Sequence, residues 1–278
     1  QVIFAATDPV HGRELWCADE VGQARLLADI YTDASVNPSS SPQQLTPAGD
    51  LLYFVANDIV HGAELWVSDG SHSGTHLLKD ILPGPGSSDP QELTPFDPFV
   101  YFTADSSRSV GLWRTDGTTE GTVSIDTDVA APLHLTVLKD RIFFSGTRPE
   151  EGRELWVLGP DQTTTLVQDI AVGPSSSSPR NMTVYDGALF FLADDGIHGE
   201  ELWRSDGTES STVMVRDIVE VPYEKIQVEA LAPSGNQLFL TANNGAQGME
   251  LWRIQEDAHR PALVKDIAQW TFANVLRV

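Results

Sequence analysis

The sequence predicts an all-β protein, a single six-bladed β-propeller domain over residues 1–278 with four antiparallel strands in each blade. Three features of the chain lead to this prediction. A Glu-Leu-Trp motif recurs at a nearly constant spacing, four strand-like runs accompany each copy, and no stretch has helical periodicity over a useful length. A repeat period in the forties that is built from short apolar runs is typical of propellers.

The Glu-Leu-Trp motif sets the register of the repeat. Its Trp residues are 50, 47, 43, 47 and 49 residues apart. The motif stands at residues 14–16, 64–66, 154–156, 201–203 and 250–252, and the imperfect copy Gly-Leu-Trp stands at 111–113. Successive side chains of a strand point to opposite faces, so we expect Leu to contact one neighbouring blade and Trp the other. We interpret the motif as core, and its Glu as part of the same scaffold because one copy has Gly111 instead.

The four runs appear in the same order in every repeat. In one full copy they cover residues 91–94, 99–103, 111–115 and 122–125, and turn residues separate them, which is the pattern of meandering antiparallel strands. The chain begins on a run of the second type and ends on residues 272–278, which read like the first-type run at 181–185. We therefore expect the last residues to supply the inner strand of the first blade, so that the ring closes without an open sheet edge.

The charge of the chain argues against two classes of partner. With 17 basic and 40 acidic residues its formal net charge is −23, so a nucleic-acid backbone or an anionic membrane would repel it. No stretch approaches the roughly 20 apolar residues that a membrane span needs, so we expect no membrane insertion.

The single cysteine and the start of the chain give two further expectations. Cys17 has no second cysteine to pair with and no neighbouring cluster that would activate it, so we expect a plain buried thiol. Gln1 is preceded by neither an initiator Met nor a signal peptide, so we expect that a preceding segment has been removed or that the chain belongs to a larger multidomain protein.

The residues after Trp resemble a known repeat. Residues 66–70, 113–118 and 203–208 read Trp-x-x-Asp-Gly, with Thr following in the last two. They resemble the ELWxxDGT repeat, also called hyalin-like, of bacterial surface and secreted proteins, and the resemblance covers essentially the whole chain. It implies a propeller-type protein outside the cell or at the cell surface. It implies no settled activity, because the shared residues are turns and core, and the pattern is lost after Trp16, Trp156 and Trp252.

The Asp-Gly turns and a repeated His are the first candidates for chemistry. An Asp could serve Ca²⁺, but one Asp per turn is too few ligands, so we interpret these turns as structural and expect no cofactor. Three of the seven His residues, His11, His61 and His198, occupy one position between the second and third strands. Separate blades keep them from sharing one Zn²⁺, whose ligands lie about 2 Å away. Either each His ties its own loop, or each such blade holds a sugar or anion pocket.

These loops are expected to share a face with the junctions between repeats. The junctions are short at residues 130–132 and 268–270 and long at residues 31–42, 82–90 and 171–179. In a ring of six the two short junctions lie opposite each other, which predicts a shallow trench suited to an extended glycan or peptide. Candidate lining residues are Trp270, His134, Arg108, Arg148, Arg180 and Tyr223. Trp270 either stacks on a sugar or caps the closing blade, and the arginines either pair with local carboxylates or hold an anionic ligand. The inner strands begin around the axial tunnel with the polar residues Gln44, Glu92, His134 and Asn181.

The leading function predicted from the sequence is a non-catalytic, lectin-like module. It would bind a carbohydrate, another surface polymer or a surface protein on the loop face. A competing hypothesis is an enzyme of hydrolase or lyase type at the axial mouth, with His134 as acid or base. A third is a structural spacer in a larger surface protein. The sequence shows no Ser-His-Asp set in a familiar context, no nucleophile elbow and no phosphate loop.

Overall fold

The computed structural model of the chain describes residues 1–32, 39–107, 109–125, 127–216, 227–243, 248–255 and 261–265. Within these ranges every regular element is a β-strand, apart from the single 3₁₀ turn η1 (Glu209–Ser211). The prediction of an all-β protein is therefore confirmed. A helix long and apolar enough to cross a membrane does not occur in the described ranges.

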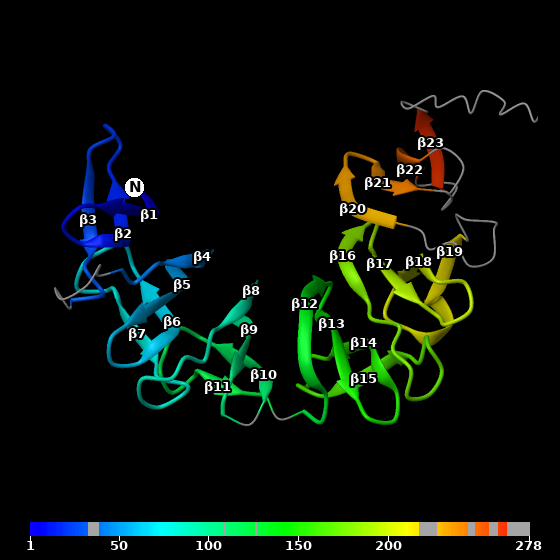
Figure 1. Cartoon of the computed structure of the whole chain (residues 1–278), viewed down its shortest axis with the longest axis horizontal. Coiled ribbons are helices and arrows are strands. Elements are labelled where there is room, and N and C mark those ends of the chain that lie inside the picture. The colour runs from blue at the N-terminus through cyan, green and yellow to red at the C-terminus, as the bar shows by residue number, and fades with distance from the viewer. Residues whose placement is uncertain are drawn as a thin grey trace, which may run out of the picture. The chain divides into compact units, whose positions relative to one another are not determined.

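The chain divides into two compact units, Gln1–Leu133 and His134–Val278. In each unit the sheets follow one another along the chain, and every sheet is a meander of antiparallel neighbours (Figure 1). The first unit holds sheet 1, with β1 (Val2–Asp8), β2 (Gly12–Ala18) and β3 (Ala24–Ala28), sheet 2, with β4 (Gln43–Ala48), β5 (Leu51–Asp58), β6 (Gly62–Ser68) and β7 (His76–Lys79), and sheet 3, with β8 (Gln91–Phe96), β9 (Phe99–Asp105), β10 (Val110–Thr115) and β11 (Val123–Ser124).

The second unit holds three more sheets, each of four antiparallel strands. It holds sheet 4, with β12 (Ala130–Leu138, which starts in the first unit), β13 (Arg141–Arg148), β14 (Gly152–Leu158) and β15 (Thr164–Gln168), sheet 5, with β16 (Arg180–Tyr185), β17 (Ala188–Asp194), β18 (Glu200–Ser205) and β19 (Val213–Arg216), and sheet 6, with β20 (Gln227–Ser234), β21 (Gln237–Asn243), β22 (Met249–Gln255) and β23 (Pro261–Lys265).

Sheets 2 to 6 each have the four strands that the repeat predicts, and sheet 1 has three. The strand expected to complete sheet 1, residues 272–278, lies outside the described residues. Closure of the ring and the single domain over residues 1–278 therefore stay predictions.

The core lies between neighbouring sheets and is built by the repeated motif. Leu15 of sheet 1 shares a buried cluster with Trp66 of sheet 2, and Leu65 shares the next one with Trp113. The second unit pairs Leu155 with Trp203 and Leu202 with Trp252 in the same way. Each of these Leu residues is 0% exposed. The expectation that Leu and Trp contact opposite neighbours is confirmed within both units, and Cys17 is buried as expected.

Candidate functional site

Three connections between second and third strands carry the same contact, which we call the Asp–His clamp. It joins Asp8 to His11, Asp58 to His61, and Asp195 to His198, with Oδ2 of each Asp 2.8, 2.8 and 2.7 Å from Nδ1 of the His. In the first two, the Asp is the last residue of its strand and pairs with the Gly that opens the next strand. Sequence spacing of three residues brings the two side chains together across the tight turn.

The same carboxylate also holds the backbone of the loop. Oδ1 of Asp8 accepts the N–H groups of Val10 and His11 at 2.7 and 2.6 Å. Oδ1 of Asp58 does so for Val60 and His61 at 2.9 and 2.5 Å. Each His therefore ties its own loop, which is one of the two interpretations of the sequence. The other, a ligand pocket at each His, is not excluded by this contact and stays a prediction.

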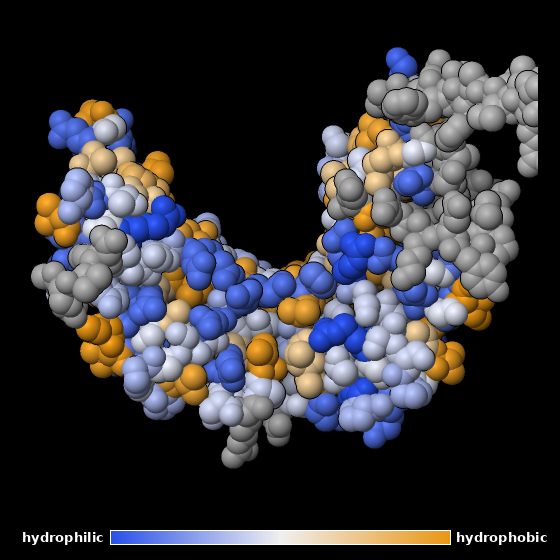
Figure 2. Space-filling model, in the orientation of Figure 1, coloured by the Kyte–Doolittle hydropathy of each residue, from blue (hydrophilic) through white to orange (hydrophobic). Residues whose placement is uncertain are grey.

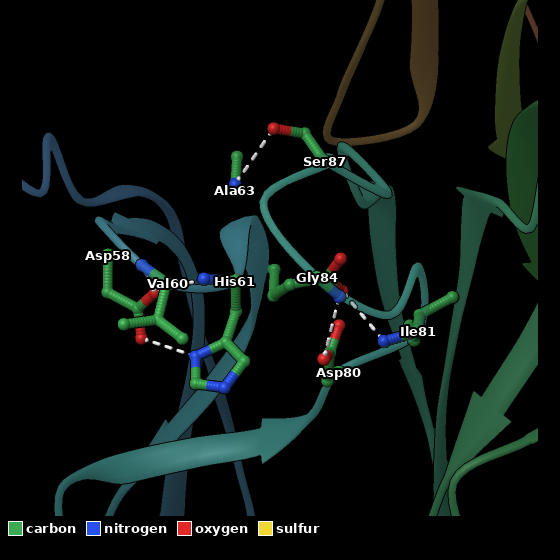
Figure 3. A network of polar contacts seen from close by, with 9 residues as sticks. Asp58, Val60, His61, Ala63, Asp80, Ile81, Gly84 and Ser87 are labelled. Atoms are coloured by element: carbon green, nitrogen blue, oxygen red, sulfur yellow. Dashed lines mark hydrogen bonds and ion pairs between the residues drawn. The ribbon is translucent and has the colours of Figure 1, made fainter.

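Charges around the clamps shift the pKa values of their members. Hydrogen bonds from the ring and backbone of His11 lower the pKa of Asp8, and the hydrogen bond to Asp8 raises that of His11. Asp58 raises the pKa of His61 in the same way, with smaller contributions from Asp80 and Glu64. Figure 3 shows Nδ1 of His61 facing Asp58. Oδ2 of Asp80 accepts the Gly84 N–H at 3.3 Å.

We expect the clamp of sheet 1 to be firmest in mildly acidic solution. Because the pKa of His11 is raised in the folded state, the stability that His11 adds to the loop is fully present below about pH 6.5. That stability is lost as the pH rises through the folded-state pKa of His11. Because the pKa of Asp8 is lowered in the folded state, the stability that Asp8 adds to the loop is fully present above about pH 4. That stability is lost as the pH falls through the folded-state pKa of Asp8. Amide exchange of Val10 and His11, corrected for intrinsic rates, should therefore be slowest between these limits. Asp8→Asn should flatten the profile, and a flat profile in the wild type would contradict the clamp.

Each clamp presents an exposed aliphatic side chain directly before its His. Val10 is 72% exposed, Val60 57% and Ile197 81%. Figure 2 shows that exposed hydrophobic residues stand singly among hydrophilic ones on the face in view. Single exposed aliphatic residues are common on protein surfaces. Val10, Val60 and Ile197 differ from such residues because all three occupy the same position, directly before the His of an Asp–His clamp.

The Glu of the Glu-Leu-Trp motif makes a second repeated contact, which we call the Ser–Glu staple. It joins Glu14 to Ser40, Glu64 to Ser88, and Glu154 to Ser177, and all three Glu residues are 0% exposed. The staple of sheet 2 is typical. Glu64 accepts from Ser88 N–H and O–H at 3.0 and 2.5 Å, and from the N–H groups of Ile81 and Leu82 at 3.1 and 3.3 Å.

Burial raises the pKa of Glu64 and of Glu154, while the hydrogen bonds that each accepts oppose the rise. In both cases all the donors come from the junction that leads to the next sheet. The motif Glu is therefore confirmed as scaffold, with a definite task. It fixes the path of the chain between sheets.

The stapled junction also bonds to both sheets that it connects. Oγ of Ser87 accepts the Ala63 N–H of sheet 2 at 2.9 Å, and the Ser88 carbonyl accepts the Asp105 N–H of sheet 3 at 2.8 Å. In the junctions after sheets 1, 2 and 4, Ser40, Ser88 and Ser177 are therefore hydrogen-bonded to the preceding sheet. The predicted trench also depends on residues 268–270, which lie outside the described residues, so it stays a prediction.

In the Asp-Gly turns, the Asp accepts hydrogen bonds from residues of its own turn. Oδ1 of Asp116 accepts the N–H and the hydroxyl of Thr118 at 2.9 and 2.7 Å, and these bonds lower its pKa. A Cβ on Gly117 would lie 2.8 Å from the Tyr53 hydroxyl of the neighbouring sheet. The turn thus packs one sheet on the next, which agrees with the structural interpretation.

The arginines predicted on the loop face are engaged with neighbouring side chains. Arg180 donates to both carboxylate oxygens of Glu200, at 2.6 and 2.5 Å. The guanidinium of Arg148 lies 4.2 Å from the ring centre of Trp156. Arg108, Tyr223 and Trp270 lie outside the described residues, so their place on the loop face stays a prediction.

The polar residues predicted around the axial tunnel share a backbone feature, and their place around a tunnel stays a prediction. Gln44, Glu92, His134 and Asn181 have φ values of 52°, 59°, 61° and 53°. In sheets 2, 3 and 5 this position falls where the pairing register shifts. The amide of Gln44 donates to the Pro90 carbonyl at 2.8 Å and so joins sheet 2 to sheet 3. Nowhere in the described ranges do three or more His, Cys, Asp and Glu residues form a group that could hold a metal ion.

Six antiparallel sheets, packed within each unit through the Leu–Trp contact, define an all-β protein of propeller type. Solved structures agree with this class. The chain matches a puromycin-hydrolyzing peptidase of Mycobacterium tuberculosis at 13% identity and a TM-score of 0.56, over 98% of this chain and 44% of that one. It matches a prolyl endopeptidase at 15% identity and a TM-score of 0.54, over 90% and 39%. The computationally designed protein Ika8 matches at 17% identity and a TM-score of 0.50, over 95% and 70%.

The chain thus spans less than half of either peptidase, with coverage of 44% and 39%. At these identities the likeness shows the fold alone. No protein-family model matches the sequence, and no curated protein matches it.

Proposed function

We propose that the chain is a non-catalytic binding module that acts outside the cell or at its surface. Its ligand is a carbohydrate or another surface polymer, bound on the face formed by the second-to-third connections. The observation that supports this most is the repeated tip, in which an Asp–His clamp holds an exposed Val10, Val60 or Ile197 beside an imidazole. A sugar ring has an apolar C–H face and polar hydroxyl edges, so an aliphatic side chain beside a hydrogen-bonding ring complements it.

Repetition of the tip favours a ligand that is itself repetitive. Weak contacts at several tips add their effects when one polymer reaches them together. This part of the proposal requires the six sheets to form one closed ring, with residues 272–278 completing sheet 1. The three-stranded state of sheet 1 among the described residues supports it.

The enzyme hypothesis has less support. Its expected acid or base, His134, has a left-handed φ of 61° at the inner-strand position that holds Gln44, Glu92 and Asn181 in other sheets. A shared backbone requirement explains a polar side chain there without catalysis, because His, Asn and similar residues tolerate this conformation.

A triple variant tests the binding proposal. Val10→Asp, Val60→Asp and Ile197→Asp together should weaken binding to the preferred polymer on a glycan array by tenfold or more, because each replaces an apolar contact with a hydrated charge. Val21→Asp is the matched control, since Val21 is 79% exposed in the turn before β3 at the other end of sheet 1.

Two further variants make the result decisive. A chain that ends at residue 265 should keep its affinity for a monosaccharide but lose avidity for the polymer, because the ring is left open. Trp270→Ala asks whether that side chain adds to binding. Equal binding by the triple variant and the wild type would overturn the role of the tips, and no binding to any glycan or polymer would leave the spacer hypothesis.

A further inference from the structure

A pocket of about 410 Å³ lies between sheets 2 and 3, at the end of the sheets opposite to the Asp–His clamps. Its walls come from the turn at residues 48–51, from Tyr53, from residues 95 and 97–100 and from Asp116. All of these belong to the first unit. The volume falls in the range of small-molecule sites, which is about 300–1,000 Å³.

Tyr53 gives this pocket an unmatched hydrogen-bonding group. The residue is only 4% exposed, yet it lines the pocket. No residue of the described ranges forms a hydrogen bond with its hydroxyl. Burial raises the pKa of Tyr53, and the nearby charge of Asp116 raises it further, so the group stays a neutral hydroxyl that can both donate and accept. The hydroxyl faces the pocket, so a ligand with a hydrogen-bonding group there replaces the solvent that the hydroxyl otherwise contacts.

The pocket wall is acidic on one side and apolar on the other. Asp50, Asp97 and Asp116 line it, and no basic residue does. Leu51, Pro98 and Phe99 supply the apolar part. Arg114 is close by, but its guanidinium stacks on Phe99 with 4.4 Å to the ring centre and is not part of the lining.

The second unit has an equivalent pocket that serves as an internal comparison. A pocket of about 210 Å³ between sheets 4 and 5 is lined by Lys139, Asp140, Arg141, Phe143 and Asp206. Strand pairing places Phe143 at the position of Tyr53, because the residue after each pairs with Trp156 and Trp66 respectively. Counting back two and four residues, Arg141 and Lys139 then stand where the first pocket has Leu51 and Gly49.

The comparison shows what the first pocket lacks. In the second, hydrogen bonds from Ser211 and Thr208 lower the pKa of Asp206, and the charge of Lys139 lowers it further, so the chain supplies its own cation beside the turn carboxylate. In the first, hydrogen bonds from Thr118 and, to a smaller extent, the charge of Arg114 lower the pKa of Asp116. Gly49 and Leu51 nevertheless leave the lining itself without a cation, while the acidic residues and the larger volume remain. The Tyr hydroxyl appears only where the cations are missing.

A metal ion does not fit this set. Within the described residues the carboxylates do not form a group of three that could share one ion. An organic cation is larger, and its apolar stem can contact Leu51, Pro98 and Phe99 while its charge meets the carboxylates. A primary ammonium also has three N–H donors, one of which the Tyr53 oxygen can accept.

We propose that the pocket between sheets 2 and 3 binds an alkylammonium group, with Tyr53 accepting from the ammonium and Asp50, Asp97 and Asp116 supplying the opposite charge. This group occurs on free diamines and on lysine side chains. The site is independent of the polymer-binding face, because it lies at the other end of the sheets. The proposal therefore stands or falls separately from the proposed function.

Titration calorimetry on the full chain tests the site with two probes, 1,5-diaminopentane and the capped tripeptide acetyl-Gly-Lys-Gly-amide. Saturable binding of at least one probe is expected, and pentane-1,5-diol should show none. Binding should weaken as salt rises from 10 to 300 mM, because the carboxylates act through charge. Diamine binding alone would identify a free amine as ligand, and binding of both would admit a lysine side chain. Saturation by neither probe at millimolar concentration would overturn the proposal.

Variants that place the cations of the second pocket in the first test whether the probes bind in this pocket or elsewhere on the acidic chain. Leu51→Arg should abolish binding by supplying an internal cation, and Tyr53→Phe should weaken it about fivefold by removing one hydrogen bond. Gly49→Lys gives an independent cation at a position with φ +58° and no atom within 4 Å of a new Cβ, so it should fold even if Leu51→Arg does not. Asp140→Asn in the other pocket should leave binding unchanged. Undiminished binding in both cation variants would rule out this pocket as the site.

Discussion

Glu64→Ala is expected to lower the free energy of unfolding by about 3–5 kcal/mol. The variant leaves the N–H groups of Ile81, Leu82 and Ser88 and the Ser88 hydroxyl buried without their common acceptor. A buried donor that loses its partner costs about 1–3 kcal/mol, and a partial collapse of the junction will recover some of this sum. Thermal unfolding should show a fall in Tm of about 10 °C.

Two further variants separate the staple from the loss of a charge. Ser88→Ala removes one donor and should cost about 1–2 kcal/mol. Glu150→Ala removes an exposed carboxylate and should change stability by no more than about 0.5 kcal/mol. If Glu64→Ala also stayed within 1 kcal/mol of the wild type, the staple would not hold the junction.

The strands and the packing of the motif could be predicted from the sequence because both depend on local patterns. Apolar runs separated by turn residues mark strands, and alternation along a strand places Leu and Trp on opposite faces. The pairing of Leu65 with Trp113 across two sheets follows directly from that alternation. None of this requires knowing how distant segments meet.

The Ser–Glu staple could not be predicted from a local pattern, because its Glu and its Ser lie far apart in the chain. Glu64 and Ser88 are separated by 24 residues. A signal was nevertheless present, since the junctions after sheets 1, 2 and 4 contain consecutive Ser residues, whereas the short junction after sheet 3 has none and its motif has Gly111. The signal is only partial, because the junctions at residues 217–226 and 268–270 also contain no Ser although their motifs have Glu201 and Glu250.

The site residues were harder to predict, because a polar side chain has more than one reason to be where it is. Gln44 and Asn181 are candidates for ligand contact, and their φ values of 52° and 53° add a backbone requirement that the sequence alone does not reveal. Tyr53 was not a candidate, because it reads as one more aromatic residue of a strand. Its role depends on a pocket shared with the next sheet and on Leu51 standing where sheet 4 has Arg141.

Gly152→Ala is the second substitution with a large expected effect, a loss of about 3–4 kcal/mol. Gly152 follows the connection between β13 and β14 and has a φ of +72°, and a Cβ there would lie 1.8 Å from the Ser175 carbonyl oxygen. Ser175 belongs to the junction that the Glu154–Ser177 staple holds. The added methyl group must therefore move a fixed backbone, whose displacement also loosens the staple.

Gly173→Ala separates the steric effect from the conformational one. Gly173 has a φ of +85° and lies in the same junction, but no atom stands within 4 Å of a new Cβ. Its cost should be only that of a left-handed Ala, about 1–2 kcal/mol. Because Gly152 and Glu154 act on one junction, their Ala variants should combine to less than the sum of the separate losses. Equal costs for the two Gly variants, or full additivity with Glu154→Ala, would show that the junction does not pack on Gly152 as the structure indicates.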